Sequence, residues 1–438
     1  MLGRRRLGVQ LVQMVFLRSV IRVVVVFVAV AAASGRTGLA QPLKAPAAAA
    51  SAWLNEVTHR VSPRDAQLVA RAQATLLGNE VSGKAWDPYL GIMPSLGTYR
   101  GIWNWDAAFH AMAVSHWDGE LAHQQVEILF SKQLPDGSLP DVIYEDGRMV
   151  TTITKPPVMA WAVAVVDHRA PDDRWIAAMY PRLQRLGDYW YLQHGGKADG
   201  LFYYSGSDIG AESGWDDSIR FDNGYREAKT DDHRLFAIDL NCYMVSHYRA
   251  MAYLAQRLKK PEDAAHWQQM ATELAARIND RLWDEQIGFY VDRDRVTGKP
   301  GPALSPAGFM PLFVRIASPE RAARMAKLAA STEKFFPGMP TAAYDTPAYK
   351  SGAYWRGPAW LNTSFFALKG LQQYGHTGPA AAMRETLLGW VARDPSLREY
   401  YDSKSGAGAG AKAFGWSAAF TIAFVLDWDN DNLTWLFR

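Results

Sequence analysis

Apolar side chains recur every three or four residues in twelve separate stretches of this chain, and this periodicity limits the possible folds more than any other feature. Such spacing puts the apolar residues on one face of an α-helix, and that face must be buried against another element. The stretches lie near residues 63–78, 105–117, 119–133, 156–167, 173–194, 235–257, 261–282, 306–315, 319–331, 358–374, 377–394 and 414–427. The sequence therefore predicts an all-α protein.

Short and long connections alternate between these stretches, which favours helical hairpins arranged in a ring. A stacked helical solenoid would share this pattern, but no fixed sequence period is visible. Strand-like segments such as residues 288–291 are expected to form short β-hairpins in the loops.

The first forty residues differ from the rest of the chain. Five arginines precede or flank an apolar run over residues 23–33, and no acidic residue occurs before Ala40. This pattern predicts a secretory signal peptide over residues 1–40, with cleavage after Ala40 or, alternatively, within residues 31–33. Translation from Met14 and a retained membrane anchor are the alternatives, although the apolar run is short for a membrane span. The mature protein is expected to be secreted or periplasmic without stable membrane insertion.

Residues 41–52 are expected to be a flexible lead-in, followed by a single catalytic domain over residues 53–438. Removing residues 1–40 removes six arginines, so 47 basic residues become 41 against 44 acidic ones. The formal charge changes from +3 to −3, which argues against a nucleic-acid partner. The one cysteine, Cys242, excludes an intramolecular disulfide. The oligomeric state is not predicted.

Two acidic clusters rich in aromatic residues suggest glycosidic bond hydrolysis. Residues 212–218 read Glu-Ser-Gly-Trp-Asp-Asp-Ser, and residues 398–402 read Arg-Glu-Tyr-Tyr-Asp. Hydrolysis with inversion needs one carboxylic acid to protonate the leaving oxygen and one carboxylate to activate water. An aromatic wall stacks on sugar rings and disfavours the charged form of a carboxyl group. Taken singly, such a cluster is more often a helix cap or a surface ion pair, so neither cluster alone indicates an active site.

The motifs around these clusters resemble those of trehalases and of glycoside hydrolase family 63, including its mannosylglycerate and glucosylglycerate hydrolase branch. The resemblance is carried, in chain order, by residues 103–106 (Trp-Asn-Trp-Asp), 212–216, 239–241 (Asp-Leu-Asn), 354–360 (Tyr-Trp-Arg-Gly-Pro-Ala-Trp), and 399–402 with 414–417 (Phe-Gly-Trp-Ser). The Pro-Gly-Gly-Arg-Phe segment associated with trehalases is absent. The resemblance implies an (α/α)6 barrel of the six-hairpin glycosidase type and an inverting reaction.

By this resemblance Asp216 is the expected general acid and Glu399 the expected general base, whereas physics alone does not choose between Asp216 and Asp217. Glu212 and Asp217 are expected to bind sugar hydroxyls, to tune the general acid, or to serve as a helix N-cap or a solvated pair. Arg356 is expected to bind a sugar hydroxyl, orient a carboxylate, bind an acidic aglycone or form a structural ion pair. The full set of substrate-binding candidates is Trp103, Trp105, Asp106, Gln133, Trp215, Asn241, Trp355, Arg356 and Trp416.

The predicted activity is exported hydrolysis of an α-glucosidic or α-mannosidic bond in a small glycoside, of the glucosylglycerate or mannosylglycerate type or a short α-glucoside. A periplasmic trehalase is the nearest alternative, and a catalytically silent carbohydrate-binding protein on the same barrel is an alternative from another class. The mechanism requires no cofactor and no metal. The glycine-rich residues 406–410, which follow the second acidic cluster, are expected to form a mobile lid.

Overall fold

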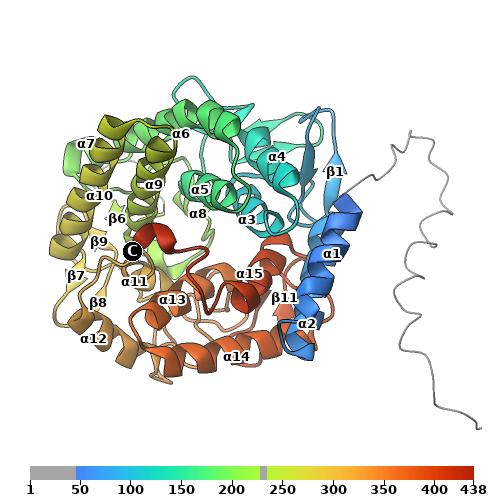
Figure 1. The fold of residues 1–438 in the computed structure, drawn as a ribbon. Helices are drawn as coiled ribbons and strands as arrows, with labels where there is room; N and C mark the ends of the chain where they lie inside the picture. Colours follow the sequence, from blue (N-terminus) through green and yellow to red (C-terminus); the bar gives the residue numbers. More distant parts are fainter. Residues whose placement is uncertain (1–45, 227–233) are drawn as a thin grey trace, which may run out of the picture. The chain divides into compact units, whose positions relative to one another are not determined.

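Six helices line the interior of the fold in residues 46–226 and 234–438, the part of the chain that the computed structural model describes. They are α3 (Asn104–Val114), α5 (Met159–Arg169), α9 (Ile238–Arg257), α11 (Met310–Phe313), α13 (Leu361–Gln373) and α15 (Gly415–Leu426). Each contacts the next, and α15 returns to contact α3 (Figure 1). The inner helices therefore form a closed ring.

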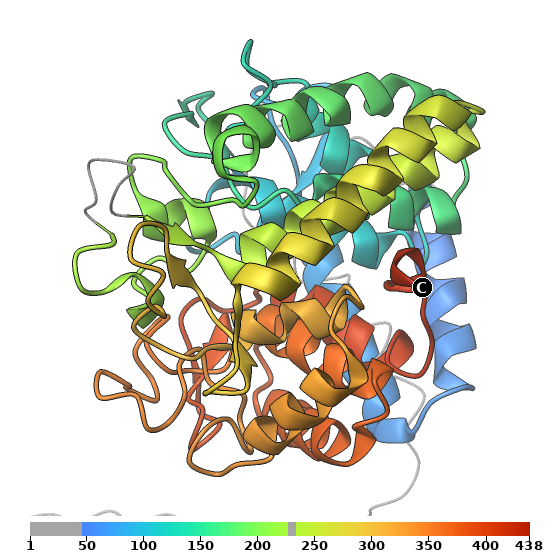
Figure 2. The same cartoon turned by 90° about the vertical axis from the view of Figure 1, so that its left-hand side faces the viewer.

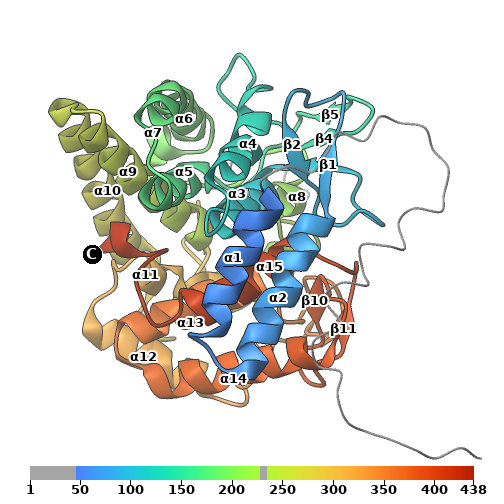
Figure 3. The same ribbon diagram turned by 45° about the vertical axis from the view of Figure 1, so that its right-hand side comes forward.

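A second set of helices lies outside this ring and alternates with the first along the chain (Figure 1). It consists of α2 (Pro63–Gly78), α4 (Gly119–Phe130), α6 (Asp173–Gln193), α10 (Pro261–Arg281), α12 (Pro319–Ala329) and α14 (Thr377–Arg393). The first of these, α2, packs on α15 and closes the outer layer (Figure 3). The predicted (α/α)6 barrel is confirmed, and the solenoid alternative is excluded by ring closure.

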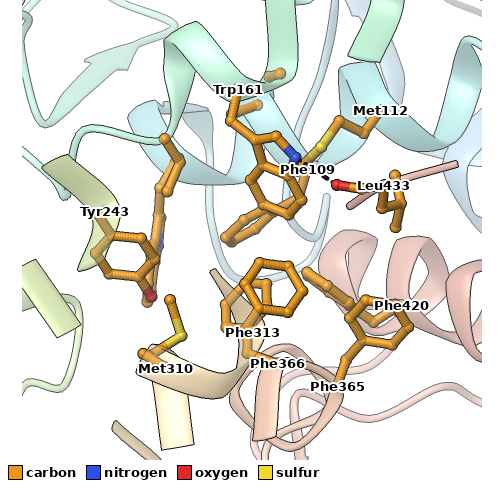
Figure 4. Packing of buried hydrophobic residues seen from close by; sticks show 14 of the residues in the cluster. Phe109, Met112, Trp161, Tyr243, Met310, Phe313, Phe365, Phe366, Phe420 and Leu433 are labelled. Atoms are coloured by element: carbon orange, nitrogen blue, oxygen red, sulfur yellow. Dashed lines mark hydrogen bonds between the residues drawn. The ribbon is translucent and has the colours of Figure 1, made fainter. Parts of the chain in front are cut away.

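The centre of the barrel is packed with large apolar side chains from all six inner helices (Figure 4). Aromatic rings meet edge to face, as in the contact of Phe109 on α3 with Phe420 on α15 at a centroid distance of 5.0 Å. The indole of Trp161 donates a hydrogen bond of 2.8 Å to the carbonyl of Leu433, so this buried donor is paired. Below its mouth the barrel is therefore a solid core and not a channel.

Short strands and short helices occupy the connections. The strands are β1 (Glu80–Ser82), β2 (Leu90–Ile92), β3 (Gly101–Trp103), β4 (Val142–Tyr144), β5 (Met149–Val150), β6 (Leu235–Phe236), β7 (Trp283–Asp284), β8 (Phe289–Tyr290), β9 (Arg293–Asp294), β10 (Tyr400–Tyr401) and β11 (Gly408–Ala409). The short helices are α7 (Gly196–Asp199), α8 (Ile209–Ser213), η1 (Ile219–Phe221), η3 (Pro306–Phe309) and η4 (Trp435–Phe437). The predicted hairpin near residues 288–291 is the antiparallel pair β7–β8. In side view, long loops and short strands gather at one end of the barrel (left in Figure 2).

Some helix boundaries differ from those predicted from the sequence. Helix α1 (Pro46–Thr58) begins inside residues 41–52, which were expected to be flexible; its alanine-rich sequence has the highest helix propensity. Helix α5 begins at Met159 and not at residue 156, because the proline pair at 156–157 precedes it in a tight turn, in which the amide of Val158 bonds the carbonyl of Pro156. Residues 1–40, predicted to be a signal peptide, lie outside the described residues. None of the described helices is long and apolar enough to cross a membrane.

Candidate active site

A pocket opens where the inner helices begin. It is lined by Pro94, Tyr99, Trp103, Trp105, Asp106, Lys155, Gly214, Asp216, Tyr354, Trp355, Glu399, Phe414 and Trp416. Five of these residues lie in the first turn of an inner helix or directly before it, namely Trp103, Trp105, Asp106, Phe414 and Trp416. The others lie in the connections between helices, so residues far apart in sequence meet at one end of the barrel. The pocket encloses about 380 Å³, including the open space at its mouth.

Two of the predicted carboxyl groups, Asp216 and Glu399, line this pocket together, and each is held by a tyrosine. The hydroxyl of Tyr354 is 2.8 Å from Oδ2 of Asp216, and the hydroxyl of Tyr99 donates to Oε1 of Glu399 at 2.7 Å. The amide of Ala411 donates to the other oxygen of Glu399 at 2.8 Å. The structure thus brings together the two acidic clusters that lie far apart in the sequence.

Glu399 is 4% exposed, and burial raises the pKa of its carboxyl group. The hydrogen bonds from Ala411 and Tyr99 oppose this shift, whereas the nearby Asp216 adds to it. Gly410 makes this arrangement possible, because its φ of +70° favours glycine and a β-carbon there would collide with the carboxylate of Glu399. Residues 400–401 and 408–409 form the β10–β11 hairpin, so the glycine-rich segment expected to be a lid builds a hairpin that supports Glu399.

The segment that carries Asp216 leaves α8 through Gly214, whose φ is +75°. A β-carbon at Gly214 would overlap the indole of Trp105, so glycine allows the chain to pass directly over that ring. The neighbouring Asp217 does not line the pocket; its Oδ1 accepts a hydrogen bond of 2.8 Å from the amide of Trp355. Geometry therefore separates two adjacent aspartates that the sequence could distinguish only by resemblance.

Asp106 lies in the first turn of α3, 3% exposed, and Oδ1 of its carboxyl group has no hydrogen-bond partner. Burial raises its pKa well above the ordinary value, and the ammonium of Lys155 opposes that shift. Lys155 itself is 7% exposed, pairs with Asp141 at 3.1 Å and donates to the carbonyl of Ala211. The pocket therefore holds an unsatisfied buried carboxyl group beside a buried cation.

Four tryptophans make up much of the remaining wall: Trp103, Trp105, Trp355 and Trp416. Trp105 and Trp416 meet edge to face at 5.2 Å, and Trp355 lies 6.3 Å from Trp416. Indole faces of this kind stack on the apolar faces of sugar rings. All four were predicted from the sequence motifs, and all four line the pocket.

Trp215 and Arg356, also predicted to bind substrate, lie behind the pocket. Trp215 is 1% exposed and stacks on Trp355 at 5.2 Å. Arg356 binds Asp222 at 2.6 Å and the carbonyl of Asp217 at 2.9 Å. Of the roles left open for Arg356, the structure supports the structural ion pair, which fixes the segment that follows Asp216.

The buried side chain of Glu212 also has a structural role. One of its carboxylate oxygens accepts 2.8 Å hydrogen bonds from the amides of Ser205 and Gly206. This pairing joins α8 to the preceding loop, so of the roles considered for Glu212 the structural one agrees with its position.

Gln133 and Asn241 do not line the pocket, and their predicted role in substrate binding is not supported. Gln133 donates to the carbonyls of Gly137 and Arg182. The amide group of Asn241 accepts from the amide of Phe202 at 2.9 Å and donates to the carbonyls of Phe202 and Ala237. Both polar side chains form hydrogen bonds with backbone groups. Local sequence does not distinguish this structural role from ligand binding.

Asn241→Ala is accordingly expected to destabilise the protein. The substitution leaves the buried amide of Phe202 without its acceptor, which costs about 1–3 kcal/mol in the free energy of unfolding. Urea denaturation measures this loss. Ser246→Ala on the same helix is the matched control, because the buried hydroxyl of Ser246 has no partner to lose. Equal stability of Asn241→Ala and the parent would contradict the structural role.

Sequence reasoning missed three pocket residues with ionisable side chains: Tyr99, Lys155 and Tyr354. A signal was available for two of them, because Lys155 directly precedes the predicted helix 156–167 and Tyr354 opens a quoted motif. Sequence reasoning also missed Arg220, a fully buried residue that pairs with Asp239 and Asp292 and lies 4.8 Å from the ring of Trp215. These two ion pairs fix Arg220 and the segment that follows Asp216.

Comparison with known proteins identifies the family. The model of the mannosylglycerate hydrolase MGH1-like glycoside hydrolase domain matches residues 99–417. The chain belongs to this family. It is 26% identical over 402 residues to mannosylglycerate hydrolase MGH1 of Selaginella moellendorffii, an alignment covering 76% of this chain and 82% of the relative. This family member is therefore a glycoside hydrolase, which favours an enzyme over the silent binding protein left open by the sequence.

Two further comparisons bear on this glycoside hydrolase. The crystal structure of the family 63 mannosylglycerate hydrolase from Thermus thermophilus in complex with glucose superposes with a TM-score of 0.71 at 27% identity, covering 82% of this chain and 99% of that one. A periplasmic trehalase of Salmonella paratyphi B is 26% identical over 408 residues, covering 78% of this chain and 69% of the relative. The solved structure shares the fold of this chain, and both relatives are named as enzymes that hydrolyse a glycoside.

Proposed function

We propose that this glycoside hydrolase cleaves an α-glucosidic or α-mannosidic bond in a small glycoside with inversion, using Asp216 as general acid and Glu399 as general base. One observation carries the proposal: both carboxyl groups line a single small pocket walled by tryptophans. In this scheme Asp216 protonates the leaving oxygen while Glu399 deprotonates the attacking water on the opposite face. Buried surroundings suit both steps, since they strengthen the electrostatic interactions that act on the reacting atoms.

Asp106 and Lys155 are proposed to bind the hydroxyl groups of the nonreducing sugar. The unpartnered oxygen of Asp106 accepts from a hydroxyl, and the neighbouring ammonium is a donor for an adjacent one. A buried carboxylate discriminates strongly, because a substrate lacking the hydroxyl leaves that charge unsatisfied. The limited volume of the pocket supports a small glycoside over a polymer.

Export of the enzyme is part of the proposal. It is supported by the arginine-flanked apolar run in residues 1–40 and by the similarity to a periplasmic trehalase. Contacts place residues 46–438 in one compact unit, which supports a single catalytic domain after the signal. Mass determination of the protein recovered from the periplasm would reveal cleavage after Ala40; an intact N-terminus would contradict this part of the proposal.

Proton NMR of the mature protein with trehalose, kojibiose, maltose, glucosylglycerate and mannosylglycerate tests the reaction. Initial release of the β-anomer from an α-linked substrate is expected, with glucosylglycerate or mannosylglycerate preferred. Initial release of the α-anomer would contradict inversion. Preferential cleavage of trehalose would instead identify the enzyme as a trehalase, the activity for which one of its relatives is named.

Asp106→Asn is expected to stabilise the free enzyme while it weakens substrate binding. Burial raises the pKa of Asp106 in the folded protein well above 3.8, its ordinary value in the unfolded chain. The folded state therefore loses stability as pH rises from 3.8 toward the raised pKa, because the unfolded chain ionises Asp106 more easily. The amide variant lacks this loss, and its unfolding free energy at neutral pH exceeds that of the parent by about 1–3 kcal/mol. Its KM rises because the charged acceptor is gone.

Urea denaturation at pH 5 and pH 8, together with steady-state kinetics, measures both effects. Asp146→Asn is the control, since Asp146 forms an exposed ion pair with Arg148 and such pairs contribute little. A destabilised Asp106→Asn variant, or one with unchanged KM, would contradict the proposed role.

A further inference from the structure

Three consecutive residues, Tyr354, Trp355 and Arg356, bind the segment that carries the proposed acid. The hydroxyl of Tyr354 donates to Oδ2 of Asp216 at 2.8 Å, and the amide of Trp355 donates to Oδ1 of Asp217 at 2.8 Å. Arg356 donates to the carbonyl of Asp217 at 2.9 Å. The position of the acid is therefore set by a segment 138 residues later in the chain, and Tyr354 is the member of that segment that bonds the carboxyl group of Asp216.

The side chain of Tyr354 is itself held in one direction. Its φ is +36°, in a region of backbone space that residues other than glycine rarely adopt. Such a conformation persists where the surrounding structure enforces it, and it occurs most often at functional sites. The indole of Trp360 donates to the carbonyl of Tyr354 at 2.9 Å, and the two rings meet edge to face at 5.4 Å. The fold thus fixes the direction of the Tyr354 hydroxyl.

The two carboxyl oxygens of Asp216 have different surroundings. Oδ2 accepts from Tyr354, whereas Oδ1 has no hydrogen-bond partner in residues 46–226 and 234–438. Burial and then the charge of Asp216 raise the pKa of Tyr354, so this hydroxyl keeps its proton and stays a donor. A neutral carboxylic acid carries its proton on one oxygen and accepts on the other. Because Oδ2 is occupied as the acceptor, the proton of the neutral acid lies on Oδ1.

We propose that Tyr354 is a positioning residue for the general acid: it binds Oδ2 of Asp216 and so keeps the transferable proton on Oδ1, facing the glycosidic oxygen. The inference rests on the proposed role of Asp216. In the reaction the Oδ1–H bond breaks, and its proton forms an O–H bond with the leaving oxygen. Asp216 becomes a carboxylate, and Tyr354 keeps its own proton throughout.

The same hydrogen bond supports the transfer as it proceeds. Negative charge develops on the carboxyl group of Asp216 while the proton leaves, so the bond from Tyr354 becomes charge-assisted. Charge-assisted hydrogen bonds are shorter and stronger than neutral ones. An interaction that is stronger in the transition state than in the ground state accelerates the chemical step. Tyr354 therefore acts on the rate through Asp216 and not through contact with the sugar.

Tyr354→Phe tests this role on two substrates. The phenylalanine ring keeps the contact with Trp360 but lacks the hydroxyl, so kcat on a natural glycoside should fall on the order of 10–100-fold, as expected for loss of a hydrogen bond to a charged group. The α-fluoride of the same sugar departs without protonation, and the variant should hydrolyse it at close to the parent's rate. Activity on the fluoride also shows that the variant is folded.

The double variant Tyr354→Phe with Asp216→Asn tests whether the hydroxyl acts through the acid. It should be no slower on the glycoside than Asp216→Asn alone, because no proton remains to be positioned. Tyr349→Phe is the matched control on the same loop, since its hydroxyl lies 2.7 Å from Oγ of Ser403 and the residue does not line the pocket. This control should keep the parent's kcat on both substrates.

Three results would overturn the positioning role of Tyr354. These are an unchanged kcat of Tyr354→Phe on the glycoside, an equal loss on glycoside and fluoride, and a double variant slower than Asp216→Asn. An equal loss on both substrates would show that the hydroxyl supports the pocket or binds the sugar. Failure of the acid assignment is separate, because Asp216→Asn itself would then show no difference between glycoside and fluoride.

Discussion

Asp216→Asn is expected to lower kcat by about 10²–10⁴-fold on a natural glycoside, the range that general acid catalysis contributes. The amide keeps the shape of the side chain and can still bond the Tyr354 hydroxyl, but it has no proton to give to the leaving oxygen. The loss should depend on the leaving group. The α-fluoride of the same sugar departs without protonation, so the variant should hydrolyse it at close to the parent's rate.

Asp217→Asn provides the matched control for this prediction. Asp217 is the adjacent residue with the same side chain, but its carboxylate accepts from the amide of Trp355 outside the pocket. An asparagine oxygen can accept that bond, so the variant should keep most of its activity on both substrates. If Asp217→Asn shows the leaving-group dependence and Asp216→Asn does not, the acid has been assigned to the wrong neighbour.

Helix positions could be predicted from this sequence because the buried face of a helix requires apolar residues three and four positions apart. Helices α2 and α10 begin at Pro63 and Pro261, where the expected ranges begin. Ring closure could not be derived that way, because the contact of α15 with α2 and α3 depends on the curvature summed over the whole barrel. The alternation of short and long connections favoured a ring of hairpins, but only the sequence resemblance implied a closed (α/α)6 barrel.

Site residues could be predicted where a motif marked them and where their side chains line the pocket. Asp216 and Glu399 satisfy both conditions. Asn241 also lies in a motif, but its side-chain amide bonds backbone groups of Phe202 and Ala237. Phe202 is 39 residues away, and no local sequence pattern reveals a partner at that distance. Tyr99 was missed because no motif marks it. Its place in the pocket depends on a hydrogen bond to Glu399, which lies 300 residues later.

Glu399→Gln should differ from Asp216→Asn in the one respect that separates a base from an acid. A glutamine cannot take the proton from water, so kcat should fall by about 10²–10⁴-fold on natural glycosides and on the α-fluoride alike. A better leaving group does not help when the missing step is activation of water. Hydrolysis of the fluoride at the parent's rate by Glu399→Gln would contradict its assignment as the base.

The pH profile of the parent enzyme provides an independent measurement of the same group. Burial and the nearby Asp216 raise the pKa of Glu399 above its ordinary value of 4.5. The base acts only as a carboxylate, so the acidic limb of the kcat/KM profile should fall as pH drops through that raised value. In Tyr99→Phe the carboxylate loses a hydrogen bond that stabilises its charged form, and the acidic limb should move to still higher pH. Because Gln at position 399 has no such ionisation, the residual activity of Glu399→Gln should lack this limb, which identifies Glu399 as its source.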